Sequence, residues 1–269
     1  MPVQLIDSHV HLQAEAFDED RGQVVQRAAD AGVAVFVCNG SVPADWQAVS
    51  DLAASDARVC PFLGLHPWYV NEHRGTDWLA ALRGQLEKTR SGVGEIGLDR
   101  WVKGFDIEAQ VSAFRAQVDL ARDLGRPVTI HCLRAWGLLL EELRRAAPLP
   151  AGFLVHAFGG APDMVKPLTD LGAYLSFAAS VLDPARRRTR ESLLEVPGHR
   201  LLIETDSPDI PPLPGLRVPG RTLPDGTYRN EPANLPAILE GVAGLRHEPV
   251  EALARQLWEN GQVLLKGLL

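Results

Sequence analysis

The sequence predicts a single α/β domain of the (β/α)8 TIM-barrel class over residues 1–269. Short apolar runs alternate with segments of helical period through most of the chain, which favours parallel strands joined by right-handed crossovers. The length of 269 residues is close to the roughly 250 of a typical barrel, and no repeat or linker divides the chain. A doubly wound open sheet would show the same alternation and is the alternative.

Eight apolar or β-branched runs are expected to be the strands. In chain order they are Val3–Asp7, Ala34–Cys38, Val59–Leu65, Gly92–Gly97, Pro127–His131, Phe153–His156, Ala173–Phe177 and Leu201–Thr205. The clearest helix lies between the fourth and fifth runs. Its apolar positions follow one another at steps of four and three, and it should end at Gly125, before Pro127 opens the next strand. These positions are Ile107, Val111, Phe114, Val118 and Ala121.

The longest loop is expected over Ser207–Arg229, with prolines at positions 208, 211, 212, 214, 219 and 224. A helix should follow it, because Asn230-Glu231-Pro232 combines a capping residue with an acid and a proline in the first turn. Loops of this length inside a compact domain are usually functional or disordered, and its place after the last strand favours function.

Composition and charge exclude several classes of protein. Apolar residues make up 46 % and charged residues 23 %, as in ordinary globular proteins, which excludes a disordered chain or a small disulfide scaffold. The 27 basic and 34 acidic residues give a net charge of −7, which argues against a broad basic surface for nucleic acid. A bound metal ion could still supply local positive charge.

Targeting signals are not evident. The N-terminal residues lack a basic region followed by an apolar one, and no apolar run approaches the roughly 20 residues that a membrane helix needs. Cys38, Cys60 and Cys132 form no C-x-x-C pair and are expected to be free thiols in a reducing compartment. We therefore expect a cytoplasmic protein with no membrane partner.

Two histidines follow the first strand segment at the spacing of a metal half-site. His9 and His11 are two residues apart, so they should point to one side while Val10 points to the other. The C-terminal strand ends of a barrel form its active-site face, where two imidazoles can ligate a divalent metal.

Other strong polar residues stand at the ends of other predicted strands. Glu95, His131, His156 and Asp206 would meet His9 and His11 at the same face of the barrel. Converging histidines and carboxylates would repel one another or stay unsatisfied unless a cation binds them. The sequence therefore predicts a metal site, with two metals rather than one.

These residues belong to motifs through which the sequence resembles the TatD-type metal-dependent deoxyribonucleases of the amidohydrolase superfamily. The motifs occur in the family's order from residue 5 to about residue 240. They are Asp7-Ser8-His9-Val10-His11, Gly64-Leu65-His66-Pro67, Gly94-Glu95-Ile96-Gly97-Leu98-Asp99, Pro127-Val128-Thr129-Ile130-His131, Val155-His156-Ala157-Phe158, Glu204-Thr205-Asp206-Ser207-Pro208 and Arg229-Asn230-Glu231-Pro232.

The resemblance implies a (β/α)8 barrel with two divalent metal ions, which could be Mg, Mn or Zn. It implies Glu95 as a ligand that bridges the two. His9, His11 and Asp206 would complete one site with Glu95. His131 and His156 would complete the other.

The chain departs from the family at three places on the expected substrate rim. Trp68 stands where a histidine is common, and Ala157-Phe158-Gly159-Gly160 replaces Cys-Phe-Ser-Gly. An arginine is usual two residues after His131, where this chain has Leu133, with Arg134 next. None of these positions is an expected ligand, so they bear on substrate choice rather than on the metal site.

The activity that the resemblance implies is hydrolysis of DNA phosphodiester bonds by a water that two metals activate. Asp206 is the candidate general base, and Glu95 is the second catalytic residue. His66, Arg134 and Arg229 are candidate contacts to substrate phosphate, and Trp68 and Trp101 are candidates to stack on a base.

Two alternatives stay open at this stage. The same site could hydrolyse a small amide, ester or phosphoester, because an activated water attacks carbon as well as phosphorus. A barrel that binds metal or a partner without catalysis is the other, and the complete ligand set argues against it.

Overall fold

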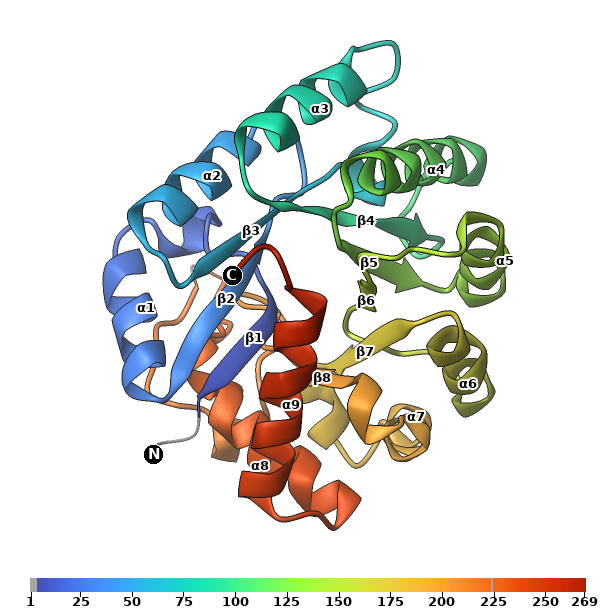
Figure 1. Ribbon diagram of the computed structural model, residues 1–269. Coiled ribbons are helices and arrows are strands. Elements are labelled where there is room, and N and C mark those ends of the chain that lie inside the picture. Colours follow the sequence, from blue (N-terminus) through green and yellow to red (C-terminus); the bar gives the residue numbers. More distant parts are fainter. Residues whose placement is uncertain (1–3, 224) are drawn as a thin grey trace.

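The computed structural model describes residues 4–223 and 225–269, and in this part of the chain eight parallel strands form a nearly closed barrel with helices between them (Figure 1). The strands neighbour one another in chain order, as the predicted (β/α)8 barrel requires. They are β1 Leu5–Val10, β2 Val33–Asn39, β3 Val59–Leu63, β4 Gly92–Asp99, β5 Val128–Leu133, β6 Phe153–Val155, β7 Ala173–Phe177 and β8 Leu201–Ile203.

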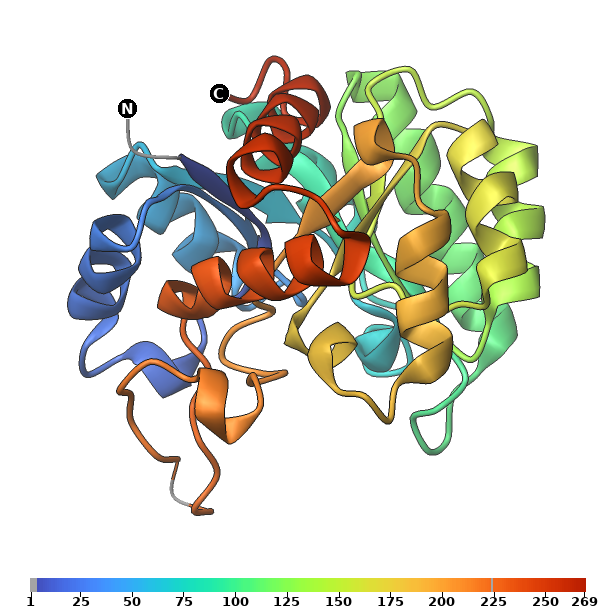
Figure 2. The ribbon, with the colours of Figure 1, turned by 90° about the horizontal axis from the view of Figure 1, so that it is seen from below.

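The α-helices lie outside the sheet, except that the last one crosses one end of it. They are α1 Arg21–Asp30, α2 Trp46–Ser55, α3 Trp78–Lys88, α4 Ile107–Leu124, α5 Trp136–Ala146, α6 Pro162–Asp170, α7 Arg187–Glu195, α8 Leu235–Arg246 and α9 Val250–Leu264. Leu264 and Leu265 at the end of α9 pack with Ile6, Phe62 and Leu154. The C-terminal helix thus covers the barrel at the end where the strands begin (Figures 1 and 2). None of the helices in the described part of the chain is long and apolar enough to cross a membrane.

The seam between β8 and β1 is joined by individual hydrogen bonds in place of a regular ladder. The backbone N–H of Asp206 donates to the carbonyl of His9 at 3.0 Å, and that of His11 donates to the carbonyl of Ser207 at 2.9 Å. The buried Asp7 carboxylate accepts from the Thr205 N–H at 2.9 Å and from its hydroxyl at 2.5 Å. These bonds tie the end of β8 to the end of β1, which brings Asp206 beside His9.

The structure differs from the predicted strand bounds at this seam. The first strand runs on to Val10, beyond the expected end at Asp7, because Asp7 and Ser8 are buried and form hydrogen bonds with the end of β8 and the residues after it. Val3, its expected start, lies outside the described residues. The eighth strand stops at Ile203, before the expected Thr205, because the chain bends across the barrel end to meet β1.

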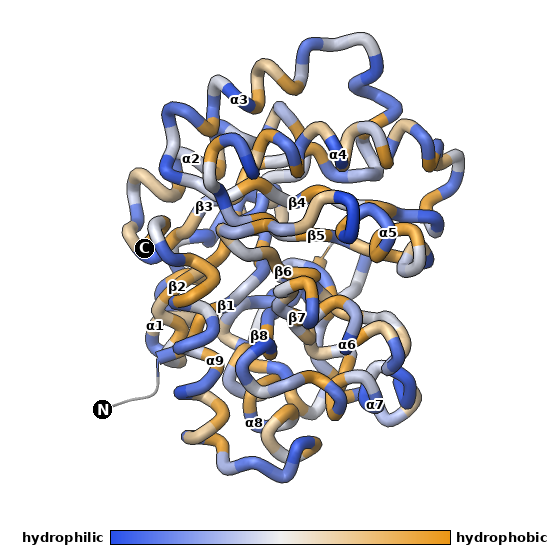
Figure 3. The backbone as a smooth tube through the Cα atoms, turned by 45° about the vertical axis from the view of Figure 1, so that its right-hand side comes forward, coloured by the Kyte–Doolittle hydropathy of each residue, from blue (hydrophilic) through white to orange (hydrophobic). Residues whose placement is uncertain are grey.

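Helix α4 shows how the apolar pattern becomes packing. Phe114, Val118 and Ala121 are buried against the sheet, and Gly125 ends the helix in the left-handed region at a φ of 63°, as predicted. Along α4 in Figure 3, hydrophobic residues recur between hydrophilic ones. The helix predicted to start at Asn230 is delayed: a 3-10 turn over Pro232–Asn234 comes first, and α8 begins at Leu235.

The long loop after β8 extends from the barrel to one side (Figure 2). Within it, a 3-10 turn covers Pro214–Leu216 and a single bridge joins Thr222 to Tyr228. Of the prolines expected to shape this loop, the one at position 224 lies outside the described residues. The loop is anchored by Arg229 and Asn230 at its far end.

Candidate metal centre

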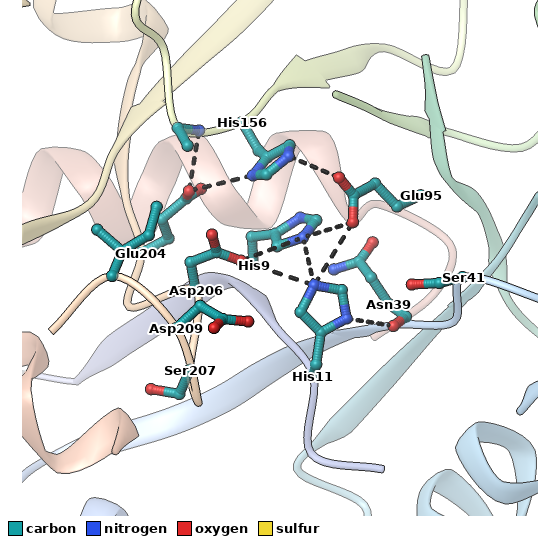
Figure 4. A network of polar contacts seen from close by, with 12 residues as sticks. His9, His11, Asn39, Ser41, Glu95, His156, Glu204, Asp206, Ser207 and Asp209 are labelled. Carbon is teal, nitrogen blue, oxygen red and sulfur yellow. Dashed lines mark hydrogen bonds and ion pairs between the residues drawn. The ribbon is translucent and has the colours of Figure 1, made fainter. Parts of the chain in front are cut away.

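Strand β1 presents two imidazoles at the end of the barrel where the strands finish. The Nε2 atoms of His9 and His11 lie 3.3 Å apart, and Val10 between them is fully buried in the core on the other side. The Nδ1 of His11 lies 2.8 Å from the Asn39 carbonyl, which fixes the ring with Nε2 directed inward. Figure 4 shows both rings pointing toward Glu95 and Asp206.

The Glu95 carboxylate on β4 lies between two groups of histidines. Its Oε2 atom is 3.2 Å from His9 Nε2 and 3.4 Å from His11 Nε2. Its Oε1 atom is 2.8 Å from His156 Nε2 and 3.1 Å from His131 Nδ1. Oε1 also lies 3.3 Å from His66 Nε2, so each oxygen faces a different group of imidazoles, an arrangement that suits a carboxylate bridging two cations.

Asp206 completes the group on the β1 side. Its Oδ1 atom lies 3.7 Å from His9 Nε2 and 3.6 Å from His11 Nε2. The backbone of Asp206 has a φ of 54°, which is unusual for a residue other than glycine and is found most often at functional sites. The bend that ends β8 thus points this carboxylate toward the imidazoles.

The spacing of these atoms fits metal coordination. Ligands bound tetrahedrally at about 2.0 to 2.1 Å lie about 3.3 Å from one another. The pairwise separations around Glu95 and Asp206 range from 2.8 to 3.7 Å. Three-ligand sets that could hold an ion include His9 with His11 and Asp206, and His9 with Glu95 and His156. The buried Nδ1 of His9 has no hydrogen-bond partner among the described residues.

Burial and charge shift the pKa values in this cluster in opposite directions. Burial lowers the pKa of His9 to about 4, so its imidazole is neutral and free to ligate at neutral pH. Burial raises the pKa of Asp206 well above its usual value, so the ionised carboxylate needs a nearby cation. Burial opposes ionisation of Glu95 as well, but His156, His66 and His9 outweigh it and hold the pKa of Glu95 well below its usual value.

A second carboxylate positions His156. Glu204 is fully buried, and its Oε1 atom lies 3.3 Å from His156 Nδ1 and accepts from the Ala157 N–H at 2.9 Å. Its other oxygen accepts a hydrogen bond from the Ser176 hydroxyl. Carboxylates that hold the outer nitrogen of a histidine orient the ring and raise its basicity as a ligand.

Asp99 does the same for His131 and also reaches the rim. Its Oδ2 atom lies 2.9 Å from His131 Nε2 and accepts from the Trp68 indole at 2.7 Å. Its Oδ1 atom accepts from the backbone N–H groups of Trp101 and Val102, at 2.6 and 3.0 Å. Burial would lower the pKa of His131, but hydrogen bonds to Asp99 and Glu95 outweigh it and raise that pKa.

A glycine and a glutamine hold the strand that carries Glu95 and Asp99. Gly97, between them on β4, has a φ of 155°, and a Cβ added there would lie 2.0 Å from the His131 carbonyl oxygen, so only glycine fits. Gln110 on α4 accepts from the Asp99 N–H at 2.8 Å and donates to the Asp99 carbonyl at 2.9 Å. The register of Glu95 and Asp99 toward His131 depends on both.

The three expected substrate contacts have different positions. His66 joins the cluster, with Nε2 at 3.3 Å from Glu95 Oε1 and Nδ1 accepting from the Trp68 N–H at 3.2 Å. Arg134 is exposed just beyond β5, where its backbone has a φ of 56°. Both residues thus lie at the barrel end that carries the ligands.

Arg229 is not brought to the cluster, which corrects the expectation that it contacts phosphate. Its side chain is 1 % exposed and donates to Asp20 at 2.6 Å and to Glu231 at 2.7 Å. Its guanidinium also lies 4.8 Å from the centre of the Phe17 ring. Arg229 therefore joins the long loop to the segment before α1, and its charge is satisfied inside the protein.

The family model for TatD related DNase matches residues 6–266. The chain belongs to this family. A protein from Erwinia billingiae named 3'-5' ssDNA/RNA exonuclease TatD is 35 % identical, over 97 % of this chain and 99 % of that one. The crystal structure of YjjV, a TatD homologue from Escherichia coli, matches with a TM-score of 0.89 and 29 % identity, over 98 % of both chains. A TatD-family hydrolase from Entamoeba histolytica shares the fold, with a TM-score of 0.86, 21 % identity and 98 % of both chains covered.

Family membership and the histidine–carboxylate cluster identify the protein as a TatD-type nuclease, a hydrolase acting on phosphodiester bonds. Sequence reasoning did not assign a role to Asp99, although alternation along β4 from Glu95 through Gly97 to Asp99 places both carboxylates on one face. The roles of Gln110 and Ser176 have no sequence signal, since no motif links them to their partners, which lie 11 and 28 residues away.

Proposed function

We propose that this TatD-type nuclease is a 3′-to-5′ exonuclease on single-stranded DNA or RNA that uses two divalent cations within one barrel domain. The observation that carries the two-cation site is the Glu95 carboxylate, whose two oxygens face separate groups of imidazoles. The polarity and the single-stranded substrate come from the name of the 35 % identical relative from Erwinia billingiae.

The donor set fits divalent transition metals. We infer that His9, His11 and Asp206 hold one cation with Glu95, and that His131 and His156 hold the other with Glu95. Four imidazoles favour zinc or manganese over magnesium, which prefers oxygen ligands. When bound, two such cations would lower the pKa of the attacking water and stabilise charge on the attacking and leaving oxygens.

The chain's own residues position and move the proton. Asp206 accepts a proton from the attacking water as the water oxygen bonds to phosphorus. The bond from phosphorus to the 3′ oxygen of the remaining strand breaks, and this oxygen takes a proton from solvent. His66 lies 3.3 Å from Glu95 and is neutral at neutral pH, because burial lowers its pKa to about 4. It can therefore donate a hydrogen bond to a phosphate oxygen, and the exposed Arg134, which follows β5, adds positive charge at the same end of the barrel.

Cleavage of end-labelled nucleic acid tests this proposal. Protein stripped of metal would be re-supplied with magnesium, manganese or zinc and given single-stranded DNA, duplex DNA and RNA. A 5′-labelled single strand should yield a descending ladder, and a 3′-labelled one should release labelled mononucleotide from the start. Asp206→Asn, which keeps the size of the side chain and removes the proton acceptor, should abolish both.

Either of two results would overturn it. Cleavage that persists at full rate in Asp206→Asn would remove this residue from the reaction. No cleavage with any metal, in protein that binds two cations, would favour a hydrolase of a small amide, ester or phosphoester, for which the net charge of −7 is no obstacle.

We also infer that the protein works in the cytoplasm. Cys38, Cys60 and Cys132 are all free and buried, as expected for thiols kept reduced. Localisation of the tagged full chain by fractionation tests this inference, and recovery in a secreted fraction would contradict it.

A further inference from the structure

We propose that Trp68 and Trp101 form a stacking subsite for the bases of the substrate strand, beside the cation held by His131. This inference rests on the proposed nuclease function and specifies where the strand lies on the rim. It follows from the exposure of the two indoles, from their shared attachment to Asp99, and from the way their loops are joined.

The two tryptophans are exposed where burial would be the rule. Trp68 is 43 % and Trp101 is 55 % exposed. Trp68 follows β3 just after His66, and Trp101 follows β4, which carries Glu95. Phe105, in the same loop as Trp101, is 39 % exposed. Large apolar side chains gathered at the mouth of a site generally mark a surface that binds something.

Trp68 is fixed next to the metal centre. Its ring is edge-on to His66 and to His131, with ring centres 5.0 and 6.2 Å away. Its indole N–H donates to the same Asp99 oxygen that lies 2.9 Å from His131. One buried carboxylate therefore sets the orientation of a proposed metal ligand and of an exposed aromatic ring.

Trp101 is fixed through its backbone. Its N–H donates to the other oxygen of Asp99 at 2.6 Å, and no hydrogen bond of its side chain occurs among the described residues. The loops of the two tryptophans are joined by Asn71, whose amide donates to the Gly104 carbonyl at 3.1 Å, and by an ion pair between Arg74 and Asp106. The rim between β3 and β4 is thus one preorganised unit.

This unit suits a nucleic-acid single strand better than a duplex or a small molecule. Bases of a single strand are free to stack on aromatic rings, and each stacked base contributes about 1 to 3 kcal/mol with little dependence on its identity. Such stacking supplies affinity without a basic surface, which agrees with a chain of net charge −7. Stacking of the neighbouring bases on the two indoles would then position the phosphate at the metal centre.

The test compares KM and kcat for single-stranded oligothymidylate with those for the same strand carrying abasic residues at its 3′ end. Trp101→Ala removes an exposed ring that makes no side-chain hydrogen bond, so its fold should persist. It should raise KM for the base-bearing strand about 5-fold to 150-fold, leave kcat within about threefold, and leave KM for the abasic strand unchanged.

Two variants of Trp68 separate stacking from the hydrogen bond to Asp99. Trp68→Phe keeps a ring without the donor and should retain most of the affinity for the strand. Trp68→His keeps a donor on a smaller ring and should raise KM with little change in the metal concentration needed for activity. Trp258→Phe, near the far end of the barrel, is the matched control and should change neither constant.

An equal rise in KM on base-bearing and abasic strands, or no rise at all, would overturn the subsite. A change in the metal requirement as the main effect of Trp68→His would assign Trp68 to positioning His131 instead. Absence of cleavage by the unaltered protein on any nucleic acid would refute the proposed function itself, so the two failures are distinguishable.

Discussion

Asp99→Asn should weaken metal binding without unfolding the barrel. In the protein, the Asp99 carboxylate accepts from Trp68, Trp101 and Val102 and lies 2.9 Å from His131 Nε2. An asparagine has one acceptor oxygen, so if that oxygen serves the two backbone N–H groups, its amide N–H₂ faces the indole and the imidazole. His131 can then accept at Nε2 only by carrying its proton on Nδ1.

That change of tautomer places a proton on the nitrogen 3.1 Å from Glu95, the atom we assign to the metal. Loss of an outer-shell partner of this kind typically costs about 10-fold to 100-fold in metal affinity, or about 1.4 to 2.8 kcal/mol. In a Ser-His-Asp triad, the same aspartate-to-asparagine change also leaves the histidine in the wrong tautomer. In Asp99→Asn, we expect the loss of metal affinity to fall on the site that includes His131.

Calorimetric titration of the metal-stripped protein with zinc or manganese measures this loss. Asp56→Asn is the matched control and should bind metal as the unaltered protein does, because among the described residues the Asp56 carboxylate bonds only to Arg58 in its own turn. Unchanged affinity at both sites in Asp99→Asn, with the fold intact by circular dichroism, would refute the role of Asp99.

Three further outcomes are expected. Gln110→Leu leaves the buried N–H and C=O of Asp99 unpaired. The free energy of unfolding, measured in urea, should therefore fall by about 1 to 3 kcal/mol for each group. A fall below about 0.5 kcal/mol, as for a surface substitution, would contradict this. Hydrogen bonds from Arg229 hold the pKa of Asp20 below its usual value, so ionised Asp20 stabilises the fold above about pH 4, and this stabilisation is lost as pH falls through the folded pKa. The loss of unfolding free energy in Asp20→Asn should therefore be largest near pH 7 and shrink in acid. A loss that stays constant with pH would count against this role. Metal at 100 times its Kd should stabilise the folded protein by about 2.7 kcal/mol. Removing it with a chelator should therefore lower Tm by roughly 5 to 10 °C in thermal scans. An unchanged Tm would speak against a metal site in the folded protein.

The strand pattern was predictable because burial on both faces of a parallel sheet leaves apolar runs in the sequence. All eight predicted runs overlap strands of the barrel, with their ends shifted by a few residues. At β1 the strand continues past Asp7, which is paired with Thr205 inside the protein, whereas the apolar pattern alone predicts an end at this polar residue.

The ligand candidates were predictable for a different reason. His9, Glu95 and His131 lie on strands and Asp206 follows one, and barrel topology brings these positions to one end. Arg229 could not be placed from sequence, since its ion pair with Asp20 spans more than 200 residues and gives no local signal. A conspicuous arginine near a site motif was therefore equally consistent with a phosphate contact and with a buried structural pair.

If Glu95 holds two cations on which cleavage depends, bound metal and activity should rise together. The most direct measurement adds metal stepwise to stripped protein and follows bound metal and the rate of single-strand cleavage in the same samples. We expect activity to be restored only as the second equivalent binds, and Glu95→Gln to bind fewer than two cations and stay inactive. Full activity at one equivalent per chain, or in Glu95→Gln, would contradict it.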